Sequence, residues 1–220
     1  GRGRDGAETE MSETRVWPAS TMEGCRTVCG ERGELQRCVG GVARRGAAVG
    51  RWGGVSRVDG TVPGVAGNRQ VLEAVLPTPP GVVEQEESQA LWRDIRELSC
   101  LAPKADELVW RVNLPATAMP AFVDEARKAG CINRFFVDWA GGIVFSTMRG
   151  VQPEVDALRY RKMAEKIGAR AMILRAPDAI RSQFGAFPPV AAGVAALEQR
   201  TRAAFDPAGI FNPGRMTVQA

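Results

Sequence analysis

The spacing of apolar positions from residue 86 onward predicts alternating helices and strands. Apolar side chains recur at helical intervals in Glu86 to Leu98, and acidic residues lead that stretch, so we expect a helix. Leu108 to Leu114 alternates, is rich in strand formers and stops at a proline, which predicts a strand. A second helix is expected from Pro120 to Ala129, because a proline opens it and a glycine follows it.

The following stretch predicts a hairpin, a helix and a fourth strand. Ile132 to Met148 is expected to form the hairpin, with Ala140-Gly141-Gly142 as its turn. We expect one face of its first strand to carry Phe135, Val137 and Trp139. A helix is expected from Pro153 to Gly168, and a strand from Arg170 to Arg175.

The predicted elements therefore follow the order β-α-β-β-α-β. The simplest packing of this order is a four-stranded antiparallel sheet with two helices on one face, the ferredoxin-like arrangement. We expect an α+β fold class on this basis. The arrangement serves many unrelated functions, so it names none by itself.

The closing residues combine rigid turns with large apolar side chains. A last helix is expected after Phe187-Pro188-Pro189, ending at Asp206-Pro207 because a proline disfavours helical geometry at the residue before it. Its expected buried side consists of Val190, Val194, Leu197 and Phe205. We expect Ile210 and Phe211 to act as anchors, and a second turn at 212–215 to offer an amide, backbone donors and a cation. The alternative is a plain helix stop with a packed tail.

The first 70 residues differ in composition from the rest of the chain. They hold 15 of the 25 glycines and 11 arginines, but no Lys, Phe, Ile or Tyr. Ile and Phe supply much of the packing of a folded core, so we expect this region to be disordered or irregular. Two explanations stay open: a flexible Gly/Arg-rich arm, or GC-rich DNA translated in the wrong frame.

Charge and residue usage narrow the class of protein. The net charge is +4, and the basic residues are scattered rather than clustered, which favours a solvated surface over nucleic-acid binding. The chain has no His, and its Cys spacing does not match zinc or iron–sulfur ligation, so we expect no metal site. No apolar run reaches the roughly 18–20 residues of a membrane span. We expect a cytoplasmic protein, peripheral to the inner membrane at most through partners.

Four motifs in the second half of the chain resemble a known family. F-D-P-A-G-I-F-N-P-G-R-M (205–216) resembles the carboxy-terminal signature of FAD-linked oxidases of the vanillyl-alcohol-oxidase type. Upstream lie L-V-W-R-V-N-L-P-A-T-A (108–118), D-W-A-G-G (138–142) and I-L-R-A-P (173–177). In this order they resemble the FAD-binding subunit of bacterial glycolate oxidase, also called glycolate dehydrogenase. The resemblance covers roughly residues 85–220, the C-terminal part of such a subunit.

The resemblance implies a division of the chain into parts. Residues 104–178 would be the cap domain over the flavin, and 179–220 the segment that returns to the FAD-binding domain. Residues 73–103 would be a remnant of that domain or a linker helix, and 1–72 stay unassigned.

The resemblance also implies a cofactor and a set of site residues. FAD would be the cofactor, and the residues on its side would be Asn212, Pro213, Gly214 and Arg215. Trp139 and Arg175 are candidates for contact with a small 2-hydroxy acid such as glycolate, in the case of Arg175 through the charge of its carboxylate. The alternatives are a core aromatic for Trp139 and a strand-end surface cation for Arg175. Catalytic residues stay unassigned.

The chain also departs from the family. The Gly-rich loop that would hold the FAD diphosphate has no convincing counterpart upstream, so we expect this chain alone to bind FAD poorly and to be inactive. The expected partners are a second flavin subunit and an iron–sulfur subunit, in a complex that oxidises glycolate to glyoxylate. Two alternatives are a non-functional remnant, or a ferredoxin-like module that binds RNA or protein, for which the hairpin offers Phe135, Phe136 and Phe145.

Overall fold

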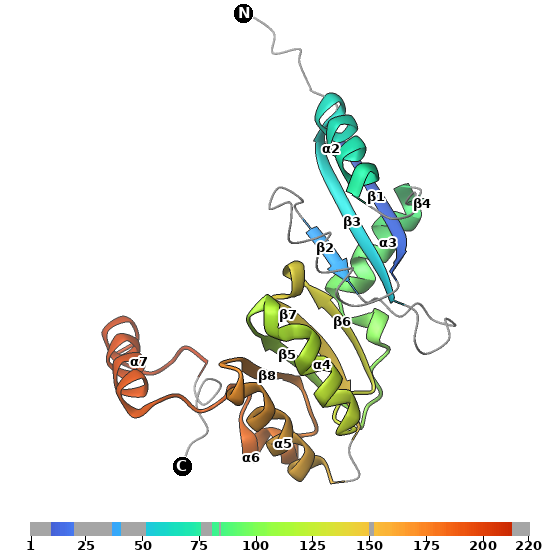
Figure 1. Cartoon of the computed structure of the whole chain (residues 1–220). Coiled ribbons are helices and arrows are strands. Elements are labelled where there is room, and N and C mark those ends of the chain that lie inside the picture. The colour runs from blue at the N-terminus through green and yellow to red at the C-terminus, as the bar shows by residue number, and fades with distance from the viewer. Residues whose placement is uncertain are drawn as a thin grey trace, which may run out of the picture.

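The strands form one antiparallel sheet in the order β4-β1-β3-β2-β6-β7-β5-β8 (Figure 1). A computed structural model of the chain describes residues 10–19, 37–40, 52–75, 81–83, 85–149 and 152–212. The strands are β1 (Glu10–Ala19), β2 (Arg37–Gly40), β3 (Trp52–Thr61), β4 (Gly81–Val83), β5 (Leu108–Asn113), β6 (Arg134–Asp138), β7 (Ile143–Met148) and β8 (Arg170–Arg175).

The helices of the described residues are α2 (Val62–Val75), α3 (Gln85–Arg96), α4 (Met119–Lys128), α5 (Pro153–Lys166), α6 (Asp178–Phe184) and α7 (Ala192–Phe205). Three short 3-10 turns, η1 (Ser99–Leu101), η2 (Ala116–Ala118) and η3 (Trp139–Gly141), lie between them.

The mixed α and β class is confirmed, and so is the βαββαβ order of the second half of the chain. The elements β5, α4, β6, β7, α5 and β8 follow one another, and their strands lie in the order β6-β7-β5-β8. The central strand β5 pairs with β7 on one side and with β8 on the other, so Val112 lies between Val144 and Ala171. This strand order is the ferredoxin-like one that the sequence predicts.

The main core lies between the strands and the helices α4 and α5. Strand side chains alternate between faces, so Trp110 and Val112 point to the same side as Val137 and Val144 and pack with the helices. The fully buried Tyr160 of α5 meets the ring of Trp110 edge-on, with ring centroids 5.2 Å apart. The Tyr160 hydroxyl shares a 2.9 Å hydrogen bond with the hydroxyl of Ser146. This bond gives a buried polar group its partner.

Helix α3 covers part of the opposite face of the sheet. Trp92 and Ile95 of α3 pack with Leu101 against Phe136 of β6 and Phe145 of β7. The two phenylalanine rings are stacked, with centroids 4.9 Å apart. We call this side the open face, because Leu174 and Arg175 of β8 remain exposed on or beside it.

The expectation of irregular structure for the N-terminal region is wrong for its described residues. β1 and β3 pair along ten residues each, from Glu10 opposite Thr61 to Ala19 opposite Trp52. β2 then joins β3 to β6 through Gly40, which pairs with Val137. These strands are stabilised by hydrogen bonds to segments far away in the sequence. The local pattern of apolar residues does not predict such pairing. Helix α2 follows β3 directly and was not predicted either.

The expected buried side of the last helix is corrected by the structure. Every residue of α7 is exposed, and Phe205 keeps 83% of its surface open to solvent. Val194 and Leu197 are likewise exposed, and Val190 just before the helix is half-buried. Figure 1 shows α7 standing apart from the sheet, beyond the edge strand β8. The helix is formed as expected, but none of its side chains packs into the core of the described residues.

The segment that leads to α7 is bound to helix α5 by one arginine. The Arg161 guanidinium of α5 donates to the backbone oxygens of Phe184, Gly185 and Ala186, at 2.6, 2.8 and 3.4 Å. The Ala186 oxygen also accepts from the Ile173 N–H at 2.8 Å, next to the free edge of β8. The short helix α6, which the sequence analysis missed, therefore ends at a fixed point from which α7 departs.

Candidate functional site

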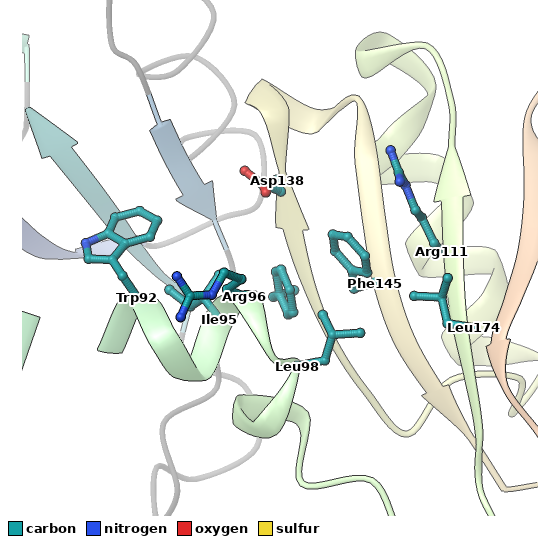
Figure 2. A pocket seen from close by; sticks show the side chains of 9 residues that line it. Trp92, Ile95, Arg96, Leu98, Arg111, Asp138, Phe145 and Leu174 are labelled. Atoms are coloured by element: carbon teal, nitrogen blue, oxygen red, sulfur yellow. The ribbon is translucent and has the colours of Figure 1, made fainter. Parts of the chain in front are cut away.

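A cavity of about 290 Å³ lies on the open face, between α3 and the strands β5 to β8 (Figure 2). Its lining combines aromatic and aliphatic side chains with two cations and one carboxylate: Trp92, Ile95, Arg96, Leu98, Arg111, Phe136, Asp138, Phe145 and Leu174. Cavities that bind small molecules are mostly apolar with a few placed polar groups, which is the composition found here.

Local structure explains how these residues meet. Arg111 and Phe145 occupy facing positions of β5 and β7, and register pairs them directly. From the other side, Trp92, Ile95 and Arg96 follow one another at helical spacing on α3. Figure 2 shows the helix and the strands contributing opposite walls of the cavity.

Arg111 is held by a neighbour on its own strand. Its Nε–H donates to the Asn113 Oδ1 at 3.1 Å, which is possible because residues two apart on a strand share a face. Within the described residues its two terminal nitrogens make no further hydrogen bond or ion pair. The guanidinium fork of Arg111 is therefore oriented and half-buried, with donors available to a ligand.

The wall at Leu98 is built from strained backbone. Leu98 has φ 60° and Ala102 has φ 41°, on the two sides of η1, a conformation that non-glycine residues seldom adopt. Arg134 donates to the Ala102 backbone oxygen at 3.2 Å and pairs with the buried carboxylate of Glu107. Glu107 also accepts from the Lys104 N–H at 2.9 Å. These contacts fix the turn, and Leu98 at its beginning, next to Arg134 at the start of β6.

Cys100 lies within this turn but is no nucleophile. Burial raises the pKa of its thiol to about 11, so the reactive thiolate is scarce at neutral pH.

Arg175, a substrate-side candidate, does not line the cavity. A bulge lies between the pairs Trp110–Ile173 and Val109–Arg175, so both Leu174 and Arg175 stand opposite Val109. Strict alternation would turn Arg175 toward the helix-side core with Ile173, and the bulge re-aims it. The side chain is exposed next to Leu174, which does line the cavity.

Trp139, the other substrate-side candidate, is not a core aromatic. It is 74% exposed and begins the 3-10 turn η3, where the sequence predicted a turn at Ala140-Gly141-Gly142. Its φ of 54° is unusual for a bulky residue and is stabilised by an N–H bond to the Asp138 carboxylate at 2.7 Å. Trp139 thus leaves the face that Phe135 and Val137 share, and stands beside the cavity residue Asp138.

The C-terminal turn is organised by Asp206. Its two carboxylate oxygens accept the N–H groups of Ile210 and Phe211 at 3.0 and 2.8 Å, and its backbone oxygen accepts from Gly209. The N–H donors, that of Phe211 foremost, lower the pKa of the Asp206 carboxyl. Ile210 and Phe211 stay 69% and 64% exposed, so they are presented rather than inserted.

Among the expected FAD-side residues, only Asn212 lies within the described residues. It is exposed and has φ 46°, a left-handed conformation that Asn tolerates. Pro213, Gly214 and Arg215 lie outside the described residues. The open-face cavity, at about 290 Å³, is too small to hold FAD. Cavities for drug-sized ligands already span about 300 to 1,000 Å³, and a dinucleotide is larger. The described residues fit a small ligand instead.

The comparison with curated proteins bears on this arrangement. The chain is similar to glycolate oxidase subunit GlcE of Escherichia coli (strain K12). The two are 24% identical over 135 residues, which make up 61% of this chain and 33% of that relative. The chain thus spans about a third of the length of the relative it matches. No protein-family model matches the chain.

This similarity agrees with the expected resemblance to a glycolate oxidase subunit. The flavoprotein superfamily, the cofactor and the division into parts stay predictions. None of the described helices is long and apolar enough to cross a membrane.

Sequence reasoning missed Arg111, because its place in the cavity depends on tertiary packing. Leu108, Val109 and Trp110 are buried and Val112 is fully buried, so Arg111 is a half-buried cation within a mostly buried strand. A cation in the middle of such a strand needs a partner or a ligand. The sequence shows the arginine, but only the packing of α3 shows that its face is enclosed.

Proposed function

We propose that this chain is the cap and return portion of a glycolate-oxidase-type FAD subunit. In this proposal residues 104–178 cover the reactive face of a flavin that is held by another domain, and 179–220 return to that domain. The intact complex, with a second flavin subunit and an iron–sulfur subunit, would oxidise a small 2-hydroxy acid, glycolate to glyoxylate. The chain alone would be inactive.

The observation that carries the proposal is the exposed apolar surface of the return segment. We call it the return seam and define it as Val194, Leu197, Phe205, Ile210 and Phe211, all at least 46% exposed. Among the described residues none packs closely enough on α7 to bury any of its side chains, and a 14-residue helix without tertiary packing is marginal in water, which favours a covering surface. The Asp206 turn holds two of these side chains ready before any partner is present.

The position of the seam fits the closing motif. F-D-P-A-G-I-F-N-P-G-R-M is the signature that implies docking against an FAD-binding domain, and its described apolar residues are the exposed ones. A packed tail, the alternative for these residues, would bury Phe205 and Phe211. Similarity to a glycolate oxidase subunit supports the same assignment from a comparison of sequences.

The RNA-binding alternative finds no support in the hairpin. Phe136 is 1% exposed, and Phe145 is half-buried and stacked on it beneath α3. Phe135 lies on the helix side of the sheet and packs against the main core. A platform for stacking bases needs aromatic rings open to solvent.

The proposal is tested by complementation with an FAD-binding domain of a glycolate-oxidase-type subunit, expressed as a separate chain. We expect the two chains to co-elute in size-exclusion chromatography and to retain more FAD than the domain alone. The double variant Ile210→Ser/Phe211→Ser should not co-elute. A matched change in an exposed apolar residue of α5, Leu158→Ser, should leave co-elution intact.

Two results would contradict the proposal. One is failure of the unchanged chain to associate with any such domain. The other is association that the seam variant and the Leu158 variant support equally.

A further inference from the structure

We propose that the open-face cavity recognises a small monocarboxylate through the terminal nitrogens of Arg111, with Asn113 as the positioning residue. This inference rests on the proposed function, because it names the group that would receive the substrate's carboxylate. It replaces Arg175, the sequence-based candidate, by a residue that lines the cavity.

The charges around the cavity favour a single negative charge. Its lining holds two cations, Arg96 and Arg111, and one carboxylate, Asp138, which sum to +1. Arg96 is exposed and lies 4.0 Å from Glu97, so water and that neighbour weaken its contribution. Arg111 is half-buried and meets no carboxylate within the described residues. Arg111 is therefore the cation of the cavity that would attract a bound anion most strongly.

The geometry of Arg111 favours a carboxylate over other anions. A guanidinium presents parallel N–H groups that match the two oxygens of a carboxylate. The Nε–H already bonds the Asn113 Oδ1 at 3.1 Å, and within the described residues the two terminal nitrogens make no hydrogen bond or ion pair. Phe145 and Leu174 beside it provide an apolar surface for a short carbon skeleton.

The size of the cavity sets the length of that skeleton. At about 290 Å³ it lies at the lower limit of small-molecule sites, and Leu98 is one of its apolar lining residues. A two- or three-carbon acid fits such a volume, whereas the dinucleotide does not. The substrate would then bind to the cap, and the cofactor would bind to the FAD-binding domain that covers the return seam.

The test uses the complete chain without any FAD-binding domain. Glycolate and its uncharged amide, glycolamide, are titrated in ligand-observed NMR. We expect glycolate to bind about tenfold more tightly or better, because charged hydrogen bonds exceed neutral ones by that margin. Arg111→Gln should abolish the preference, and Arg111→Lys should keep only part of it because lysine lacks the fork.

The role of Asn113 is tested with an isosteric pair. Asn113→Val removes the acceptor and should weaken glycolate binding roughly threefold, as expected for one exposed hydrogen bond. Asn113→Thr retains a hydroxyl acceptor and should restore most of the loss. Glycolamide binding should change in neither variant. A structural defect of the cavity would weaken the binding of glycolamide as well as that of glycolate. Arg175→Gln, outside the cavity, serves as the charge control and should bind glycolate like the unchanged chain.

Equal binding of glycolate and glycolamide, or an undiminished preference in Arg111→Gln, would overturn the inference. So would a loss in Arg175→Gln as large as that in Arg111→Gln. These results are independent of complementation: carboxylate binding without docking refutes the proposed function alone, and docking without carboxylate binding refutes this inference alone.

Discussion

Phe205 offers the sharpest test of how the return segment is used. Truncation of a buried phenylalanine to alanine lowers the free energy of unfolding by about 3–5 kcal/mol. Phe205 is 83% exposed, so the substitution by alanine removes only about a sixth of the burial of a core phenylalanine. Full burial stabilises by at most about 3 kcal/mol, which leaves about 0.5 kcal/mol at this position. The higher helix propensity of alanine offsets part of that.

The same arithmetic gives the effect on docking. If the return seam is covered by an FAD-binding domain, Phe205→Ala removes about 2 kcal/mol of burial from the complex, or roughly thirtyfold in Kd. We therefore expect unchanged urea unfolding of the isolated chain together with markedly weaker association in calorimetry. Phe122→Ala, at 1% exposure in the main core, is the positive control for unfolding and should lose several kcal/mol.

The reasoning is refuted by either half of the measurement. A loss of more than about 1.5 kcal/mol in the isolated chain would mean that α7 packs on the body of this protein in solution. Undiminished docking of Phe205→Ala would mean that the seam is not the contact surface.

Three further outcomes follow from contacts within the βαββαβ unit and the C-terminal turn. Tyr160→Phe should lower the free energy of unfolding by about 1 kcal/mol in urea melts, because Ser146 loses its buried partner. Arg134→Gln should destabilise by about 2–4 kcal/mol, since it leaves the Glu107 carboxylate buried without its ion pair, and adding Glu107→Gln should recover part of that loss. The Asp206 turn should loosen in acid: the folded-state pKa is below the ordinary Asp value, so its stabilisation is present above that value and lost as pH falls through the folded one. The protection factors of the Ile210 and Phe211 amides, taken relative to the intrinsic exchange rate at each pH, measure this between pH 6 and pH 3, and protection that does not fall would contradict it.

The proposed function requires two separate surfaces, one for a small ligand and one for a second domain. The open face offers a small, partly enclosed site with an oriented cation, and the return segment offers an apolar surface with no cover of its own. Burial of the seam would bring a second domain to the side of the sheet on which β8 is the edge strand (Figure 1).

The sequence by itself determined the βαββαβ unit of this protein. Alternation in Leu108–Asn113, helical spacing in Pro153–Lys166 and the proline and glycine stops are local signals, and local signals fix local structure. It also marked the closing turn, because Asp206 bonds backbone groups only four and five residues away.

Tertiary structure alone decided which surfaces are covered. Periodicity shows which side of an element is apolar, but not whether anything packs on it, so α7 was predicted as buried and is exposed. Register is a property of two strands, so the bulge that turns Arg175 outward cannot be read from β8 alone. The pairing of β1 with β3 spans some forty residues of sequence and was invisible for the same reason. Arg111 became a site residue only because α3 lies across from it.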